Sequence, residues 1–92
     1  MNKQLIQASK SGNLDLVKDL ISQGANIHFN NDDALRWASY NGHLEVVKFL
    51  VFKDADIHTN NDQALRWASA NGHLEVVNYL EGRIVRENLL HL

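Results

Sequence analysis

Histidine is the residue type in this sequence best suited to metal binding or acid–base chemistry, and the chain of 92 residues has five. Four of them form two pairs whose members stand thirty positions apart, His28 with His58 and His43 with His73. In a stack of helices, a repeat of this kind separates the members of a pair by about 10 Å, whereas zinc–nitrogen bonds are about 2 Å long. One metal ion cannot join either pair, so we predict no metal site and no cofactor. We interpret His43 and His73 as turn residues that satisfy backbone groups.

The serine and carboxylate side chains do not form a pattern that predicts catalysis. No serine lies beside a His–Asp pair in the sequence, and the chain has neither a cysteine nor a glycine-rich phosphate loop. Glu45 and Glu75 are most simply solvated charges on helix surfaces. We therefore predict that the protein has no catalytic residues and is not an enzyme.

Two tryptophans, each preceded by an arginine, are the residues that best indicate a binding surface. The dipeptides are Arg36–Trp37 and Arg66–Trp67, and Tyr40 lies on the same side of the helix as Trp37. Trp, Tyr and Arg are the residue types most often found as interface hot spots. The indoles either fill the groove between neighbouring helices or form a partly exposed ladder on a concave face that binds a partner. The arginines either contact that partner or stack on a neighbouring indole.

These residues repeat because the sequence itself repeats with a fixed period of thirty. The segment Asn31–Leu50 matches Asn61–Leu80 at all but four positions. Those positions are Asp33/Gln63, Tyr40/Ala70, Lys48/Asn78 and Phe49/Tyr79. The same register extends to an earlier, more diverged unit through Leu5, Ala8, Gly12, Leu14, Val17 and Leu20. Three such units are about the minimum that a stacked repeat architecture needs to bury a core.

The residue pattern of each unit predicts two short helices separated by a turn that contains glycine. In the middle unit, Asp32 or Asp33 can cap the first helix and Gly42 permits the left-handed turn that ends it. The second helix is apolar around most of its circumference, so it must lie between neighbours. We predict first helices over 3–10, 34–41 and 64–71, and second helices over 14–22, 44–52 and 74–81. No strand is expected beyond tight turns.

The segment "ALRWASYNGHLEVVKFL" (Ala34–Leu50), followed by "ADIH", resembles the ankyrin repeat. The "GANIH" of the first unit (Gly24–His28) matches as well, and the resemblance covers residues 1 to about 82. It implies an all-α, ankyrin-like solenoid of three helix-pair repeats that binds a protein without catalysis. The wording "NDDALRWAS" followed by "NGHLEVVK" is similar to ankyrin proteins of giant DNA viruses such as mimivirus. That similarity implies a host protein as the partner and the host cytoplasm as the location.

The sequence departs from the family pattern at the corner before each first helix. The Thr-Pro-Leu-His tetrapeptide is replaced by Asp33-Ala34-Leu35-Arg36, so we expect Asp33 and Arg36 to organise that corner instead. The period is also shorter than the family's usual value of about 33. Short connectors weaken the expectation that a hairpin finger docks the partner. Asp54 stands where the first unit has Gly24, at a position that favours the left-handed conformation.

The last residues, "GRIVRENLLHL", leave the repeat pattern. Val85, Leu89 and Leu92 follow helical spacing, so we expect a helix over Ile84–Leu90. This helix either caps the exposed end of the third repeat with Val85 and Leu89 or docks another chain. Phe52 similarly either packs under the connector or is an exposed anchor. We therefore expect one domain, 1–92, with repeats over about 1–30, 31–60 and 61–82 and a capping segment over 83–92.

The composition limits the classes of partner. The formal net charge is −2 and the isoelectric point is about 6.2, the wrong sign for binding phosphate backbones. No stretch approaches the roughly 18 apolar residues of a membrane span, and "MNKQLIQASK" has no apolar run of signal-peptide length. We expect a soluble intracellular protein that binds a protein, and neither nucleic acid nor membranes. A monomer is favoured, with weak self-association through the open ends of the stack as the alternative.

Overall fold

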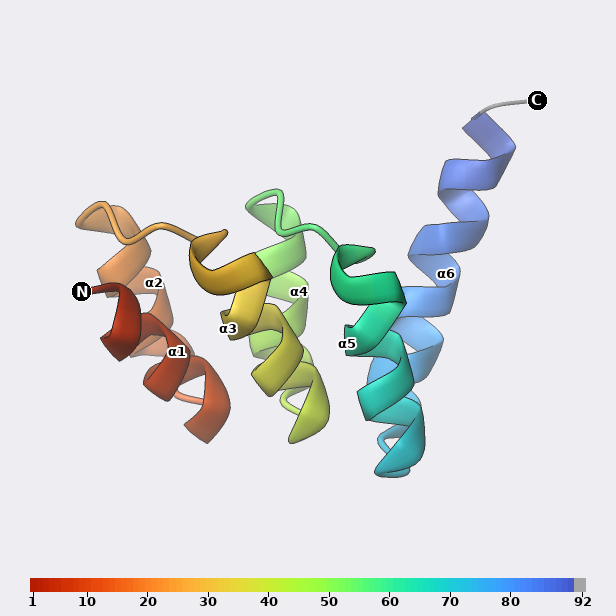
Figure 1. Cartoon of the computed structure of the whole chain (residues 1–92), viewed down its shortest axis with the longest axis horizontal. Helices are drawn as coiled ribbons and strands as arrows, with labels where there is room; N and C mark the ends of the chain where they lie inside the picture. The colour runs from red at the N-terminus through yellow and green to blue at the C-terminus, as the bar shows by residue number, and fades with distance from the viewer. Residues whose placement is uncertain (91–92) are drawn as a thin grey trace.

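The computed structural model describes residues 1–90, and its regular structure there is entirely helical (Figure 1). The six helices are α1 (Asn2–Ser11), α2 (Leu14–Ser22), α3 (Phe29–Tyr40), α4 (Leu44–Phe52), α5 (Thr59–Ala70) and α6 (Leu74–Leu90). The predicted all-α stack of three helix pairs is confirmed, and α2 and α4 have the predicted bounds. Residues 91–92, the end of the expected capping segment, lie outside the described residues.

The helices form two layers, with α1, α3 and α5 side by side in one and α2, α4 and α6 in the other (Figure 1). Alanines at one register position of the first layer, Ala8, Ala38 and Ala68, are buried and let neighbouring helices approach closely. The core fills the space between the layers. Its largest fully buried apolar side chains are Leu5, Val17, Leu35, Val46, Val47, Leu50, Val76 and Leu80.

A left-handed turn precedes the right-handed part of α3 and of α5. Asn30, Asn31 and Asp32 have φ angles of 56°, 57° and 55°, and the same three residue types repeat this conformation at 60–62. Asn and Asp tolerate the left-handed region better than other residues with side chains. The right-handed helix therefore starts at Asp33, close to the predicted start. The connector between successive repeats therefore ends in a left-handed turn, and it contains no hairpin.

Asp54, in the earlier part of the second connector, has the left-handed conformation expected at its position. Its φ angle is 71°, and Gly24 at the equivalent place has a φ angle of 103°. An aspartate thus adopts a conformation in the second connector that a glycine supplies in the first.

The C-terminal segment is helical, as predicted, but it does not fold back over the third repeat. It continues α6 in a straight line beyond the stack (Figure 1). Ile84 packs against the core, whereas Val85 and Leu89 are 55% and 61% exposed. The expectation that Val85 and Leu89 cover the end of the stack is therefore wrong. Gly82 lies inside the helix, so the chain does not turn where the fold-back requires it.

Between residues 1 and 90 the structure contains no helix that combines the length and the apolar character needed to cross a bilayer. The longest helix, α6, carries four charged side chains from Glu81 onward. They are Glu81, Arg83, Arg86 and Glu87.

Candidate functional site

Arg36 organises the corner at which the left-handed turn enters α3. Its Nε donates to the carbonyl of Asn31 at 3.0 Å, and its Nη2 donates to the carbonyl of Asn30 at 2.9 Å. The same Nη2 lies 3.1 Å from Oδ1 of Asp33. The predicted pairing of Asp33 with Arg36 is therefore confirmed, and the guanidinium also bonds two carbonyls of the left-handed turn.

Arg36 and Asp32 connect this corner to other parts of the stack. Arg36 Nη1 donates to Oε1 of Gln63 at 3.0 Å. Asp32 is buried, and its carboxylate accepts a hydrogen bond from the backbone N–H of Asp56 and lies 2.8 Å from Nδ1 of His28. The bond to Gln63 thus couples the second repeat to the third, and Asp32 joins His28 of the first repeat to Asp56 of the second.

Trp37, Tyr40 and Trp67 form one cluster of rings across α3 and α5. The Trp37 ring centroid lies 5.2 Å from that of Tyr40 and 5.5 Å from that of Trp67, and the Tyr40 and Trp67 centroids are 5.3 Å apart. Edge-on and tilted rings at these distances attract one another. Both indoles are half-buried, and Tyr40 is 38% exposed. The rings therefore fill part of the groove between the helices and also present an aromatic surface to solvent.

Cations lie on this cluster. Lys10 Nζ is 4.3 Å from the centroid of the Trp37 ring, and the Cζ atom of Arg36 is 5.7 Å from the centroid of the Trp67 ring. Of the two alternatives for the arginines, the structure shows the stacking on a neighbouring indole for Arg36. We name the surface formed by Lys10, Arg36, Trp37, Tyr40, Arg66 and Trp67 the aromatic face.

Sequence reasoning missed Lys10 and Asp32 as parts of this region. Lys10 stands at the register position of Tyr40, thirty residues earlier, so the period places it beside the neighbouring ring. The role of Asp32 could not be predicted in this way. An aspartate at this position can cap a helix or form buried hydrogen bonds between repeats, and the sequence does not distinguish the two roles.

Two of the histidines form hydrogen bonds with residues of other helices. His43 Nε2 lies 3.0 Å from the carbonyl oxygen of Lys10 and must donate the hydrogen bond, which confirms the interpretation of His43 as a backbone-satisfying residue. His58 bonds Asp62 through Nδ1, and its Nε2 lies 2.6 Å from Oε2 of Glu87 on α6. The hydrogen bonds to Glu87 and then to Asp62 raise the pKa of His58 above its ordinary value. Within residues 1–90 no three His, Asp or Glu side chains are grouped as a metal site requires.

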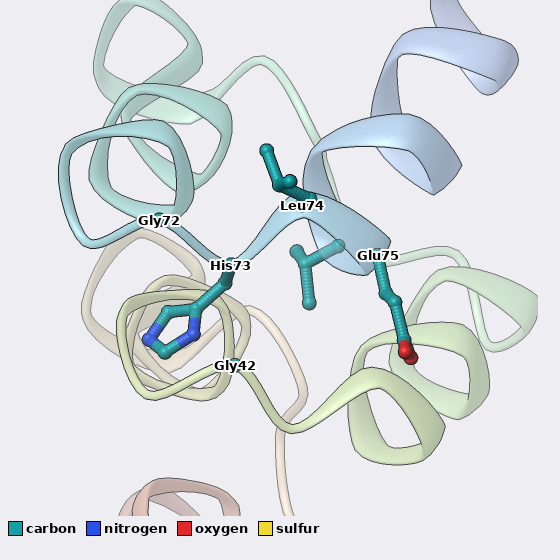
Figure 2. Close-up of a pocket in the computed structure, with 6 residues that line it drawn as sticks. Gly42, Gly72, His73, Leu74 and Glu75 are labelled. Carbon is teal, nitrogen blue, oxygen red and sulfur yellow. The ribbon is translucent and has the colours of Figure 1, made fainter.

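A shallow depression of about 390 Å³ lies at the turns that join the helices of the second and third pairs. Figure 2 shows that the imidazole of His73 lies against the end of α3 at Gly42, whereas Glu75 points toward the start of α4. The two groups that could act as acid and base therefore point in different directions. The space is bounded mainly by the turns and by Leu74 and Val76.

Comparison with known proteins agrees with the helix pairs. A family model described as ankyrin repeats (3 copies) matches residues 5–86, most of the chain. A search of curated proteins found no match to the chain. The three copies in the family model correspond in number to the three helix pairs of the structure.

Proposed function

Because the chain belongs to the ankyrin-repeat family, we propose that it binds a partner protein, without catalysis, through the aromatic face. Ankyrin repeats generally mediate protein–protein interaction, but a fold alone does not locate a site. The observation that carries the proposal is the cluster of Trp37, Tyr40 and Trp67. Its rings come from two repeats, keep part of their surface exposed and have basic groups on both sides.

The rigidity of this cluster supports a binding role. Each ring is held by the other two, and Arg36 is fixed by the corner contacts, so little side-chain freedom is left to lose when a partner docks. Pre-ordered aromatic and arginine side chains near the centre of an interface provide most of its binding energy.

The test is affinity capture from a eukaryotic cell lysate followed by mass spectrometry. The parent chain is compared with a variant carrying Tyr40→Ala and Trp67→Ala. The control is Phe52→Ala, because Phe52 is an aromatic residue of the other layer that is 77% exposed. We expect proteins captured by the parent and by Phe52→Ala to be lost with the double variant. Equal capture by all three chains, with circular dichroism showing each to be folded, overturns the proposal.

The similarity of the repeat sequence to ankyrin proteins of giant DNA viruses supports a narrower proposal. The chain is then a viral protein whose partner is a protein of the host cell. The host cytoplasm is then the place where the two meet. Capture from a lysate of a host of giant DNA viruses tests this version directly. It fails if the captured set from that lysate is no different from the set captured by Tyr40→Ala with Trp67→Ala.

We further propose that the chain acts as a monomer and does not bind nucleic acid. The net charge of −2 supports the second point. The alternative, self-association, is favoured by the open end of the third repeat, where Leu74 is 69% exposed and Ser69 is exposed although its equivalent Ser39 is buried. Sedimentation equilibrium over a range of concentrations distinguishes a constant mass from a rising one.

A further inference from the structure

Arg66 repeats the local geometry of Arg36. Its Nε donates to the carbonyl of Asn61 at 3.0 Å, and its Nη2 donates to the carbonyl of Asn60 at 3.0 Å. These carbonyls are the equivalents, thirty residues later, of the two that Arg36 bonds in the second repeat. The backbone therefore fixes the direction of both guanidinium groups in the same way.

The two arginines differ in the further contacts that their guanidinium groups make. The third repeat gives Arg36 two groups, the Oε1 oxygen of Gln63 on Nη1 and the ring of Trp67 beside Cζ. Asp33 of its own repeat adds an ion pair. Arg66 has none of these three among the described residues, because Gln63 takes the place of Asp33 and no further repeat follows within residues 1–90. Arg66 is accordingly exposed, whereas Arg36 is half-buried.

We propose that Arg66 anchors a partner segment in which an acidic residue stands next to an aromatic residue. The carboxylate takes the position that Gln63 Oε1 occupies on Arg36, and the aromatic ring covers the guanidinium as Trp67 covers that of Arg36. A planar guanidinium suits both contacts, since it binds carboxylates and stacks on rings. This inference rests on the proposed function and names the chemistry of the partner.

The charges around the site favour an acidic occupant. Lys10, Arg36 and Arg66 are the basic members of the aromatic face. The acidic side chains at the two corners are engaged, Asp33 by Arg36 and Asp62 by His58. The face therefore presents positive charge although the whole chain is negative.

The test uses random dodecapeptides displayed on phage and selected on the immobilised full chain. We expect the captured peptides to be enriched in Asp or Glu beside Trp, Tyr or Phe. Synthetic copies should bind Arg66→Gln about ten- to a hundredfold more weakly, as expected for the loss of a charged hydrogen bond. Arg66→Lys keeps the positive charge but loses the planar guanidinium, so its affinity for these peptides should lie between those of the parent and of Arg66→Gln.

The control is Lys53→Gln, which removes the same charge from an exposed residue at the end of α4 and should bind like the parent. Peptides that need Tyr40 and Trp67 but tolerate Arg66→Gln, or that lack acidic residues, overturn this inference and leave the proposed function standing. If no selected peptide responds to Tyr40→Ala with Trp67→Ala, both fail. A dimer of the parent that Arg66→Gln dissociates assigns the site to a second copy and overturns the inference as well.

Discussion

The imidazole of His73 lies on Gly42 of the preceding repeat, so closely that a methyl group on Gly42 would overlap the ring. The first and second repeats make the same contact, since a Cβ atom on Gly12 would lie 2.6 Å from Nδ1 of His43. Gly72, the third member of the series, has no such neighbour. Glycine is thus required at Gly12 and Gly42 for two reasons, its backbone conformation and the space for a ring.

Alanine substitutions of Gly42 and Gly72 separate these two requirements. Both residues have a positive φ angle, 75° and 72°, so each substitution should lower the free energy of unfolding by about 1–2 kcal/mol through backbone strain. Gly42→Ala must also displace His73, which should cost about 1–3 kcal/mol more. Urea unfolding of the two variants measures the difference. Equal losses would show that the ring moves aside without cost.

Arg36 and Arg66 form a second matched pair. Arg36→Ala removes two bonds to turn carbonyls, the bond to Gln63 and the ion pair with Asp33, whereas Arg66→Ala removes only the two carbonyl bonds. We expect losses in unfolding free energy of about 2–4 and about 1–2 kcal/mol respectively. Chemical denaturation decides between them. A larger loss for Arg66→Ala would contradict the idea that the following repeat stabilises this corner.

Asn31 tests the left-handed turn itself. It is exposed and has a φ angle of 57°, and Arg36 bonds its carbonyl rather than its side chain. Asn31→Ala should therefore lower the unfolding free energy by about 1 kcal/mol through backbone strain alone. Asn31→Gly should be tolerated, because glycine adopts this conformation without a steric cost. The ranking of the two thermal midpoints checks the prediction, and a midpoint for Ala at or above that for Gly contradicts it.

His58 should make the end of α6 sensitive to pH. Its pKa is raised in the folded chain by Glu87 and then Asp62, so the bond to Glu87 is fully present below the ordinary pKa of about 6.5. The bond weakens as the pH rises through the raised value and His58 loses its charge. Amide chemical shifts of Val85 and Asn88 should therefore move toward unfolded values above neutral pH. In Glu87→Gln that titration should flatten, and an unchanged titration there would refute the role of Glu87.

The helix pairs were predictable because three signals agree in each unit: an apolar pattern, a glycine at the turn and a fixed period. The left-handed turn was not predicted, although its signal is visible afterwards in the sequence Asn-Asn-Asp, which occurs at 30–32 and at 60–62. Asn and Asp are equally typical of helix caps and loops, so composition alone does not select the left-handed conformation. Here Arg36 does so through its bonds to two carbonyls.

Every member of the aromatic face except Lys10 was named from the sequence as a candidate, and the structure adds the geometry. Helical spacing placed Trp37 and Tyr40 on one side of a helix. The contact of Trp67 with both rings depends on how closely α3 and α5 pack, which the spacing does not give. The C-terminal segment was predicted correctly as a helix and wrongly as a cover. Apolar residues at helical spacing predict a buried face only where a neighbour exists to bury it, and α6 extends beyond the stack.

The near-identity of the second and third repeats creates an ambiguity during folding. Asn41 and His43 hold the second repeat on the first by reaching the carbonyl of Lys10. Asn71 and His73 occupy the same places thirty residues later, so the third repeat can compete for that position and leave the second looped out. Such mis-stacking is a characteristic kinetic trap of tandem repeats. Tyr40 favours the correct order, because Ala70 takes its place in the mis-stacked arrangement and gives Trp67 no neighbouring ring.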